Sequence, residues 1–199
     1  MDNSKNLYYY IMREYFTEAL VLDKKDSGEL DNLIFFYTEK LGKVVARAKS
    51  SRKITSKLAG HLEPLNYVKV RLVDKNGFQV VDALTSNRQS ALRTPKASAA
   101  QFGQALIFLQ FIEAMTMELQ PDKKIWLTIK KSFKNLEEDK FSYKPILQAL
   151  GFDPQFASCN VCEKQVDYFS KTEHVFLCKK CAVKIKKDEV VLIEHNTNL

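Results

Sequence analysis

Few residues in this 199-residue chain are of the kinds that usually carry out catalysis. Its only histidines are His61, His174 and His195. It contains no G-x4-G-K-[ST] phosphate loop, no G-x-G-x-x-G dinucleotide fingerprint, no G-x-S-x-G nucleophile elbow and no H-E-x-x-H motif. These absences argue against the common nucleotide hydrolases, dehydrogenases, serine hydrolases and zinc proteases. The chain is therefore expected not to be an enzyme.

The sequence also lacks a long uninterrupted apolar run. Its most apolar stretch, residues 99–119, is broken by three glutamines and two glutamates, which a bilayer-spanning helix would not tolerate. The apolar start, residues 7–12, is too short for a signal peptide and leads directly into Arg13 and Glu14. A cytoplasmic location is the resulting expectation.

The cysteines form one array. Cys159 and Cys162 make a first C-x2-C pair, and Cys178 and Cys181 make a second pair 15 residues later. Two such pairs place four thiolates around one ion, which is the typical ligand set of a closed structural Zn²⁺ site with no open position for substrate. His174 lies between the pairs as a further candidate ligand, with solvation the favoured interpretation. Two disulfides or four unrelated core cysteines are the alternative, which a reducing compartment disfavours.

Positive charge is unevenly distributed along the chain. The net charge is +7 and the pI is about 9.1, which favours an anionic partner. Residues 39–57 contain seven cations and one acid, and residues 179–187 contain five lysines and no acid. The alternative for either run is a solvated lysine face that keeps the protein soluble. We predict that the main contacts with an anionic partner come from Lys43, Arg47, Lys49, Arg52, Lys53, Lys57, Lys69 and Arg71.

Residues 17–85 show the pattern of a small antiparallel β unit. Strands are predicted at 19–22, 33–38, 43–49, 67–73 and 78–84, with a helical turn near 57–61 and a hairpin at Asn76-Gly77. In the third strand the cations and the small apolar residues alternate, so three cations share one face. Five short strands favour an OB-like barrel, and periodicity alone leaves a five-stranded SH3-like barrel open.

The hydrophobic period changes after Pro95. An amphipathic helix is predicted with its apolar stripe at Phe102, Leu106, Leu109, Ile112, Met115 and Leu119. A second helix should follow Pro121 and run through Trp126 to Leu136, and a third should cover residues 143–150 before Gly151. Residues 189–193 fit either a strand or a helical turn.

Several motifs together resemble one known family. The segments are EALVL (18–22), GELDNL (28–33), YTEKLGK (37–43), SKLAGHLEPL (56–65) and LQALGFDP (147–154), the last leading into Cys159. In order and spacing they are similar to the bacterial DNA repair protein family RecO, from about residue 15 to residue 182.

The resemblance implies an α+β protein: an N-terminal five-stranded OB-fold β-barrel followed by a small helical domain carrying a four-cysteine zinc finger with one structural Zn²⁺. It implies a DNA repair and recombination mediator that binds single- and double-stranded DNA and anneals complementary strands. Such proteins work with RecR, and often RecF, to load RecA onto DNA coated by single-strand-binding protein. Aromatic side chains exposed among Phe35, Phe36, Tyr37 and Tyr67 would then stack on bases.

The expected organisation is an N-terminal extension (1–11), the OB-fold DNA-binding domain (12–86), a helical domain (87–158), the zinc finger (159–185) and a C-terminal tail (186–199). The tail is shorter than the additional helices usual in the family. Where relatives commonly have glycine, this chain has Ser50-Ser51 and Glu173-His174, so those loops are expected to differ in shape. The competing hypotheses are a zinc-containing RNA-binding or ribosome-associated protein, and an enzyme with an unfamiliar site.

Overall fold

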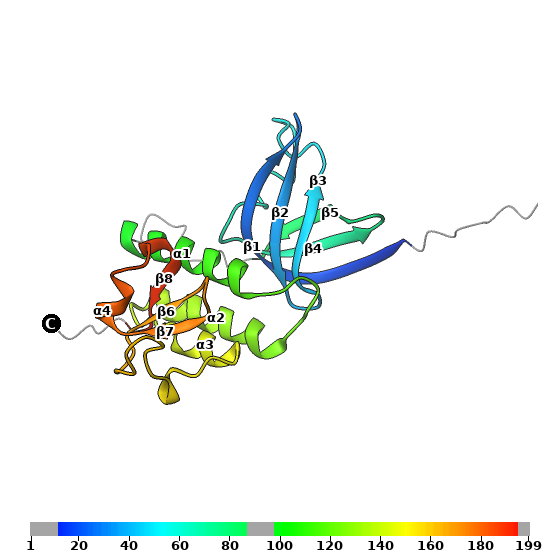
Figure 1. Ribbon diagram of the computed structural model, residues 1–199. Coiled ribbons are helices and arrows are strands. Elements are labelled where there is room, and N and C mark those ends of the chain that lie inside the picture. Colours follow the sequence, from blue (N-terminus) through cyan, green and yellow to red (C-terminus); the bar gives the residue numbers. More distant parts are fainter. Residues whose placement is uncertain (1–11, 87–97, 195–199) are drawn as a thin grey trace, which may run out of the picture.

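A computed structural model describes residues 12–86 and 98–194 of the chain, so the expected extension at 1–11 lies outside the described residues. The architecture is α+β, as predicted: a β-barrel, a group of three helices beside it, and a small three-stranded sheet near the cysteines (Figure 1). None of the helices described is both long enough and apolar enough to cross a bilayer.

The barrel contains the five predicted strands, which close in the order β1-β2-β3-β5-β4. Closure comes from a short parallel pairing in which Ala46 and Arg47 of β3 face Phe78 and Gln79 of β5. The pairing of β3 with β5 gives the ring the OB-like strand order. The strands are β1 (Arg13–Ser27), β2 (Asp31–Thr38), β3 (Gly42–Ala48), β4 (Tyr67–Asp74) and β5 (Phe78–Thr85).

The first strand is much longer than the predicted residues 19–22. Residues Arg13 to Leu20 pair with β4, whereas Ala19 to Ser27 pair with β2, and a bulge lies between Val21 and Asp23. Sequence periodicity missed the first half of the strand because its side chains are mostly exposed or half-buried and do not alternate clearly. The single strand β1 thus pairs with both β2 and β4 and bends at the bulge.

Alternation within β3 and β4 is confirmed. Val44, Ala46 and Ala48 point into the barrel, while Arg47 is exposed on the other face of β3. Val68, Val70 and Leu72 point inward from β4 in the same way, with Lys69 and Arg71 outward. The turn at Asn76-Gly77 is also confirmed, with φ of 56° and 108°, although the loop between β4 and β5 has three residues rather than two.

The segment between β3 and β4 closes one end of the barrel. It contains the single helical turn predicted near residues 57–61, where the N–H groups of His61 and Leu62 both donate to Leu58 O. Leu62 is buried in the barrel interior, whereas Leu65 is buried among the helices. This segment therefore connects the two hydrophobic cores.

Three helices follow: α1 (Ala99–Met115), α2 (Lys123–Glu137) and α3 (Lys144–Ala149). Ser98 begins α1 with a capping box, and Asp122 caps α2 by accepting a hydrogen bond from Ile125 N–H. The predicted stripe of α1 was partly wrong. Phe102 is 40% exposed and Leu119 lies beyond the helix, while Phe108 and Phe111 are fully buried. The error arose because α1 packs on more than one neighbour, so its buried surface is wider than a single stripe.

The second core joins the barrel to the helices. Trp126 of α2 is 1% exposed and its ring lies 6.4 Å from that of Tyr37 and 6.3 Å from that of Tyr67, both on the outer face of the barrel. Leu20 and Leu22 of β1 belong to the same cluster. The helices are therefore packed directly on the barrel through buried aromatic rings.

Residues 154–194, which we call the cysteine module, contain a sheet with the strand order β7-β6-β8. The segment at 189–193, undecided from sequence, combines a 3-10 turn with strand β8, which pairs with β6. Phe169 of β6 and Val191 of β8 reach the core shared with the helices. Its elements are η2 (Pro154–Phe156), β6 (Tyr168–Ser170), β7 (Val175–Leu177), α4 (Lys179–Ala182), η3 (Lys187–Glu189) and β8 (Val190–Leu192).

Candidate metal centre and nucleic-acid interface

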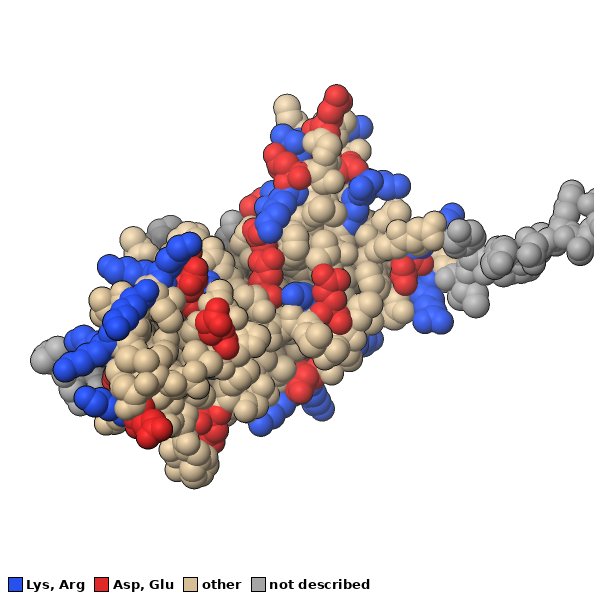
Figure 2. Space-filling view, viewed as in Figure 1, with Lys and Arg blue, Asp and Glu red and all other residues tan. Residues whose placement is uncertain are grey.

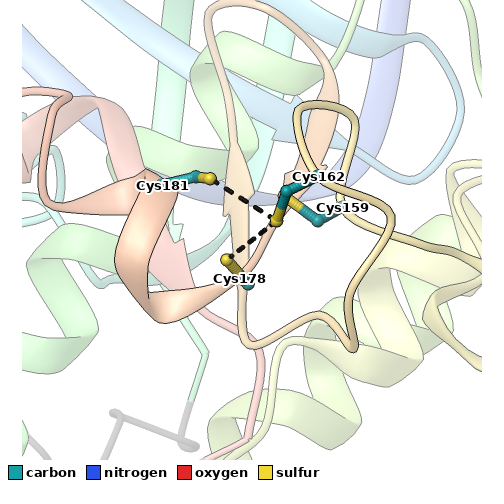
Figure 3. Close-up of side chains that lie close together, drawn as sticks. All are labelled: Cys159, Cys162, Cys178 and Cys181. Atoms are coloured by element: carbon teal, nitrogen blue, oxygen red, sulfur yellow. Dashed lines mark hydrogen bonds between the residues drawn. The ribbon is translucent and has the colours of Figure 1, made fainter.

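The four cysteines converge in the cysteine module (Figure 3). Cys159 follows η2, and Cys162 lies in the turn that ends with Glu163 in a left-handed conformation (φ 59°). Cys178 immediately precedes α4, and Cys181 lies within it. Each C-x2-C pair is thus shaped by one tight turn, which explains why the spacing of two residues brings both thiols to the same side.

The distances between the sulfur atoms suit a metal ion. The Sγ atom of Cys162 lies 3.6 Å from that of Cys178 and 3.7 Å from that of Cys181, and all four lie within 4.8 Å of one another. A tetrahedral zinc site with Zn–S bonds of about 2.3 Å has sulfur atoms about 3.8 Å apart. All four cysteines are free, so the structure does not support the alternative of two disulfides, whose sulfur atoms lie about 2.05 Å apart.

The surroundings of the thiols favour ionisation of two of them. The backbone N–H of Cys178 is the main cause that lowers the pKa of Cys159 to about 6, and the N–H of Cys181 lowers the pKa of Cys178. Hydrogen bonding with the Cys178 thiol raises the pKa of Cys181. Thiols this close repel one another when they are all ionised, and a divalent cation removes that repulsion. The donor set therefore fits Zn²⁺ and leaves no position for a substrate.

His174 is not part of this group. It is exposed in the turn between β6 and β7, and its ring lies 5.8 Å from that of Phe152. Among residues 12–86 and 98–194, the group of candidate ligands consists of the four cysteines. The prediction that His174 is solvated rather than a metal ligand thus agrees with its exposed position outside the cysteine group.

Five of the eight predicted nucleic-acid contacts are exposed and form no ion pair with any residue that the structure describes, and four of these five lie on β3 and in the loop after it. Arg47 lies on the outer face of β3, and Lys49, Lys53 and Lys57 lie in the loop that follows. We call these four residues the barrel basic surface. Arg47 and Lys49 also line a groove of about 340 Å³ together with Asn76, Gly77 and Phe78 from the hairpin between β4 and β5.

Two other predicted contacts hold the structure together. The ammonium group of Lys43 donates to Glu113 O at 2.8 Å, which joins β3 to α1. Arg52 pairs with Asp26 at 3.3 Å and donates to Gly28 O in the hairpin between β1 and β2. Their charges are therefore partly used within the protein.

The last two predicted contacts, Lys69 and Arg71, lie on a different and electrically mixed surface. Glu14 pairs with Arg71, and this hydrogen bond is the main cause that raises the pKa of the Arg71 guanidinium. Across the strands, Lys69 faces Glu18 and Arg71 faces Asp82. A groove of about 460 Å³ on this face contains both signs of charge. The structure thus does not bring all eight residues into one continuous basic track.

The aromatic residues expected to be exposed for base stacking are not exposed. Phe36 and Tyr37 are buried, and Phe35 and Tyr67 pack against the core shared with the helices. Burial also raises the pKa of Tyr37 to about 12. The expectation failed because Phe36 belongs to the barrel interior, whereas Tyr37 and Tyr67 lie on an outer face that α2 covers.

One exposed aromatic was missed. Phe16 is 59% exposed on β1, and the Arg71 guanidinium lies 5.5 Å from its ring centre. The sequence would have indicated this position only with the first strand predicted to begin at Arg13. Phe16 then lies opposite Arg71 on the neighbouring strand. Phe16 thus offers a flat apolar surface beside a cation.

Comparison with known proteins agrees with this architecture. The family described as recombination protein O, N terminal, matches residues 12–87, which include the whole barrel. A DNA repair protein RecO from Thermodesulfovibrio yellowstonii is 28% identical over 178 residues, covering 84% of this chain and 70% of the relative. RecO proteins from Myxococcus xanthus and a Roseiflexus species are 24% and 27% identical.

The last two alignments cover 90% and 85% of this chain, and 78% and 63% of the relatives. The similarity thus extends from the barrel through the helices into the cysteine module. With the barrel matched as a domain and relatives of one name aligned over most of its length, this chain is similar to RecO proteins from the barrel into the cysteine module.

Proposed function

We propose that this chain is a DNA repair and recombination mediator that binds single- and double-stranded DNA and anneals complementary strands. The observation that carries the proposal is the barrel basic surface, four exposed cations on an OB-like barrel that form no ion pair with any other described residue. Arg47 in β3 and Lys49 in the turn that follows line the same groove, so their charges lie on one side of the barrel. Such an arrangement suits successive phosphates of one strand.

The proposed mechanism needs no chemical step in the protein. Two complementary strands repel each other through their phosphates, and lysine and arginine side chains that neutralise those phosphates lower the barrier to pairing. Base pairing itself then drives annealing. The chain therefore acts as a non-catalytic mediator without nucleotide hydrolysis.

We assign the DNA-binding role chiefly to the barrel, residues 12–86, and a supporting role to the helices and the cysteine module. Similarity to RecO proteins supports RecR and single-strand-binding protein as partners, RecF as a further partner, and RecA as the protein loaded in the end. The proposed place of action is the nucleoid in the bacterial cytoplasm, where these partners and the DNA are found.

We further propose that the four cysteines hold one Zn²⁺ whose role is structural. The ion would connect the turn at Cys159 and Cys162 to the start of α4 and so fix the sheet β7-β6-β8. Zinc supplies folding free energy at such a site because all four positions are taken by protein thiolates.

Annealing of complementary DNA strands precoated with single-strand-binding protein, without nucleotide triphosphate and at two salt concentrations, tests the main proposal. The chain should accelerate annealing, and the acceleration should fade as salt rises. Structured RNA in place of DNA separates a DNA mediator from an RNA-binding protein. No acceleration by folded protein, with or without RecR, contradicts the proposal.

Replacing Arg47, Lys49 and Lys53 by Gln tests the barrel basic surface. Each phosphate contact on single-stranded DNA contributes about 0.7 to the slope of log affinity against log salt, so the triple variant should flatten the slope by about 2. Lys69→Gln/Arg71→Gln should change it less, because those cations lie among acidic side chains. Equal effects of the two variants would show that the assignment is wrong.

A further inference from the structure

A second strongly basic surface lies on the cysteine module, and neither the metal centre nor the barrel accounts for it. It consists of five lysines on α4 and the turn into η3, which we call the cysteine-module lysines: Lys179, Lys180, Lys184, Lys186 and Lys187. All five are exposed. Figure 2 shows Lys and Arg side chains gathered at the end of the molecule where Figure 1 places α4 and β8, with acidic side chains between this end and the barrel.

The geometry of the metal centre forces these lysines outward. Cys178 and Cys181 turn their thiols toward the other two cysteines, and Ala182, the last residue of α4, is buried. The remaining side chains of this turn must therefore project to the surface, as Val183 does at 81% exposure. The outward orientation of Lys179 and Lys180 is thus set by the same turn that places the thiols, and Lys184, Lys186 and Lys187 are exposed in the segment that follows.

Neither neutralisation of the zinc–thiolate group nor ion pairing within the protein balances the charge of these lysines. A zinc ion with four thiolates carries two negative charges, which five lysines exceed. Within the described parts of the chain, the one ion pair of these lysines joins Lys186 to Glu189 at 3.7 Å, and the Lys186 side chain remains 79% exposed. Most of the positive charge is therefore available to an anionic partner.

We propose that the cysteine-module lysines form a second nucleic-acid surface, which holds one DNA strand while the barrel basic surface holds another. This inference rests on the proposed function in DNA annealing. Lysines spread along a turn suit the repeated phosphates of a strand in a sequence-independent way, since each lysine acts as a flexible point charge. A chain that binds two strands on separate surfaces brings them together without any second copy of itself.

A second-strand capture experiment with the full zinc-loaded chain tests this inference. Immobilised oligo-dT is saturated with protein and washed, and fluorescent oligo-dT is then added, so that no base pairing is possible. The wild type should capture the second strand. Lys180→Gln/Lys184→Gln/Lys187→Gln should lower capture about tenfold and first-strand affinity less than about threefold, since three phosphate contacts are removed from the second surface only.

Two matched variants control for charge and folding. Lys123→Gln/Lys124→Gln/Lys131→Gln removes the same charge from exposed positions on α2 and should leave capture unchanged. Replacing Lys180, Lys184 and Lys187 by Arg keeps the charge and should retain capture. If the Gln triple variant loses zinc, the three single replacements provide the test, each with an expected two- to threefold loss.

The outcomes separate the two proposals. Failure of the wild type to bind even the first strand overturns the proposed function. First-strand binding with capture unchanged in the Gln variants, or lost equally in the α2 variant, overturns the second surface alone. If poly-glutamate binding depends on these lysines whereas strand capture does not, the surface serves an acidic protein segment and the assignment to nucleic acid is wrong.

Discussion

At the scale of single residues, Ser50 has a strained backbone conformation, whereas its neighbour Ser51 makes buried hydrogen bonds. Ser50 has φ of 53° and His174 has φ of 55°, so both stand in the left-handed conformation that glycine prefers, at the two places where the resemblance to RecO implies glycine. The expectation that these loops differ in shape is thus not needed to accommodate the missing glycines. Ser51, in contrast, is buried, accepts a hydrogen bond from the Asn32 side chain and donates one to Ala48 O.

Ser50→Gly is therefore expected to stabilise the protein by about 0.5 kcal/mol, because relief of the left-handed strain slightly exceeds the added entropy of the unfolded chain. Ser51→Ala should destabilise it by about 1–3 kcal/mol, because Asn32 loses a buried hydrogen-bond partner. Urea unfolding of both variants provides the comparison. A lower midpoint for Ser50→Gly than for the wild type would contradict the interpretation of its backbone.

At the scale of elements, the junction between the barrel and the helices depends on a close backbone contact. Gly42 begins β3 with φ of 70°, and a Cβ atom there would lie 2.3 Å from Gln120 O, just before α2. Gly42→Ala must therefore move the loop between α1 and α2 away from the barrel. We expect a loss of about 2–4 kcal/mol in the free energy of unfolding, from steric overlap and the unfavourable φ together.

Gly103→Ala is the matched control. Gly103 lies in α1, and an added Cβ would meet nothing within 4 Å. The same chemical change should there stabilise the protein by about 0.5–1 kcal/mol through helix propensity. Thermal unfolding of the two variants side by side measures the difference, and a similar midpoint for both would rule out the close contact as the cause.

At the scale of the whole molecule, the barrel has a core of its own and the cysteine module does not stand apart. The barrel interior is a separate cluster, whereas Phe169, Val191 and Ile193 of the cysteine module share the core that contains Trp126. Loss of the metal should therefore affect the helices as well as the sheet β7-β6-β8, while the barrel interior stays closed.

Cys162→Ser is expected to lower zinc content strongly and to increase amide hydrogen exchange in β6, β8 and α1, with little change inside the barrel. Val161→Ser is the control, since Val161 is 70% exposed beside the same turn and offers no metal ligand. Metal analysis together with exchange measurements checks both variants. Full zinc content in Cys162→Ser, or equal exchange throughout the chain, would contradict the structural role.

The sequence by itself determined the features that depend on local spacing. Alternation of side chains identified the inward faces of β3 and β4. Asp122 indicated where one helix begins and Gly151 where another ends. The two C-x2-C pairs predicted the cysteine group. Each of these is set by the geometry of a few consecutive residues, so one short window of sequence contains it.

Which side chains stay exposed and without a charged or aromatic partner depends on the tertiary structure. Lys43 looks like Arg47 in sequence, but a helix 70 residues further along the chain binds its ammonium group. Tyr37 and Tyr67 lie on the outside of the barrel, yet Trp126 covers them. Exposure and charge pairing depend on which distant elements pack together, and that follows from burial of the whole apolar surface rather than from any local pattern.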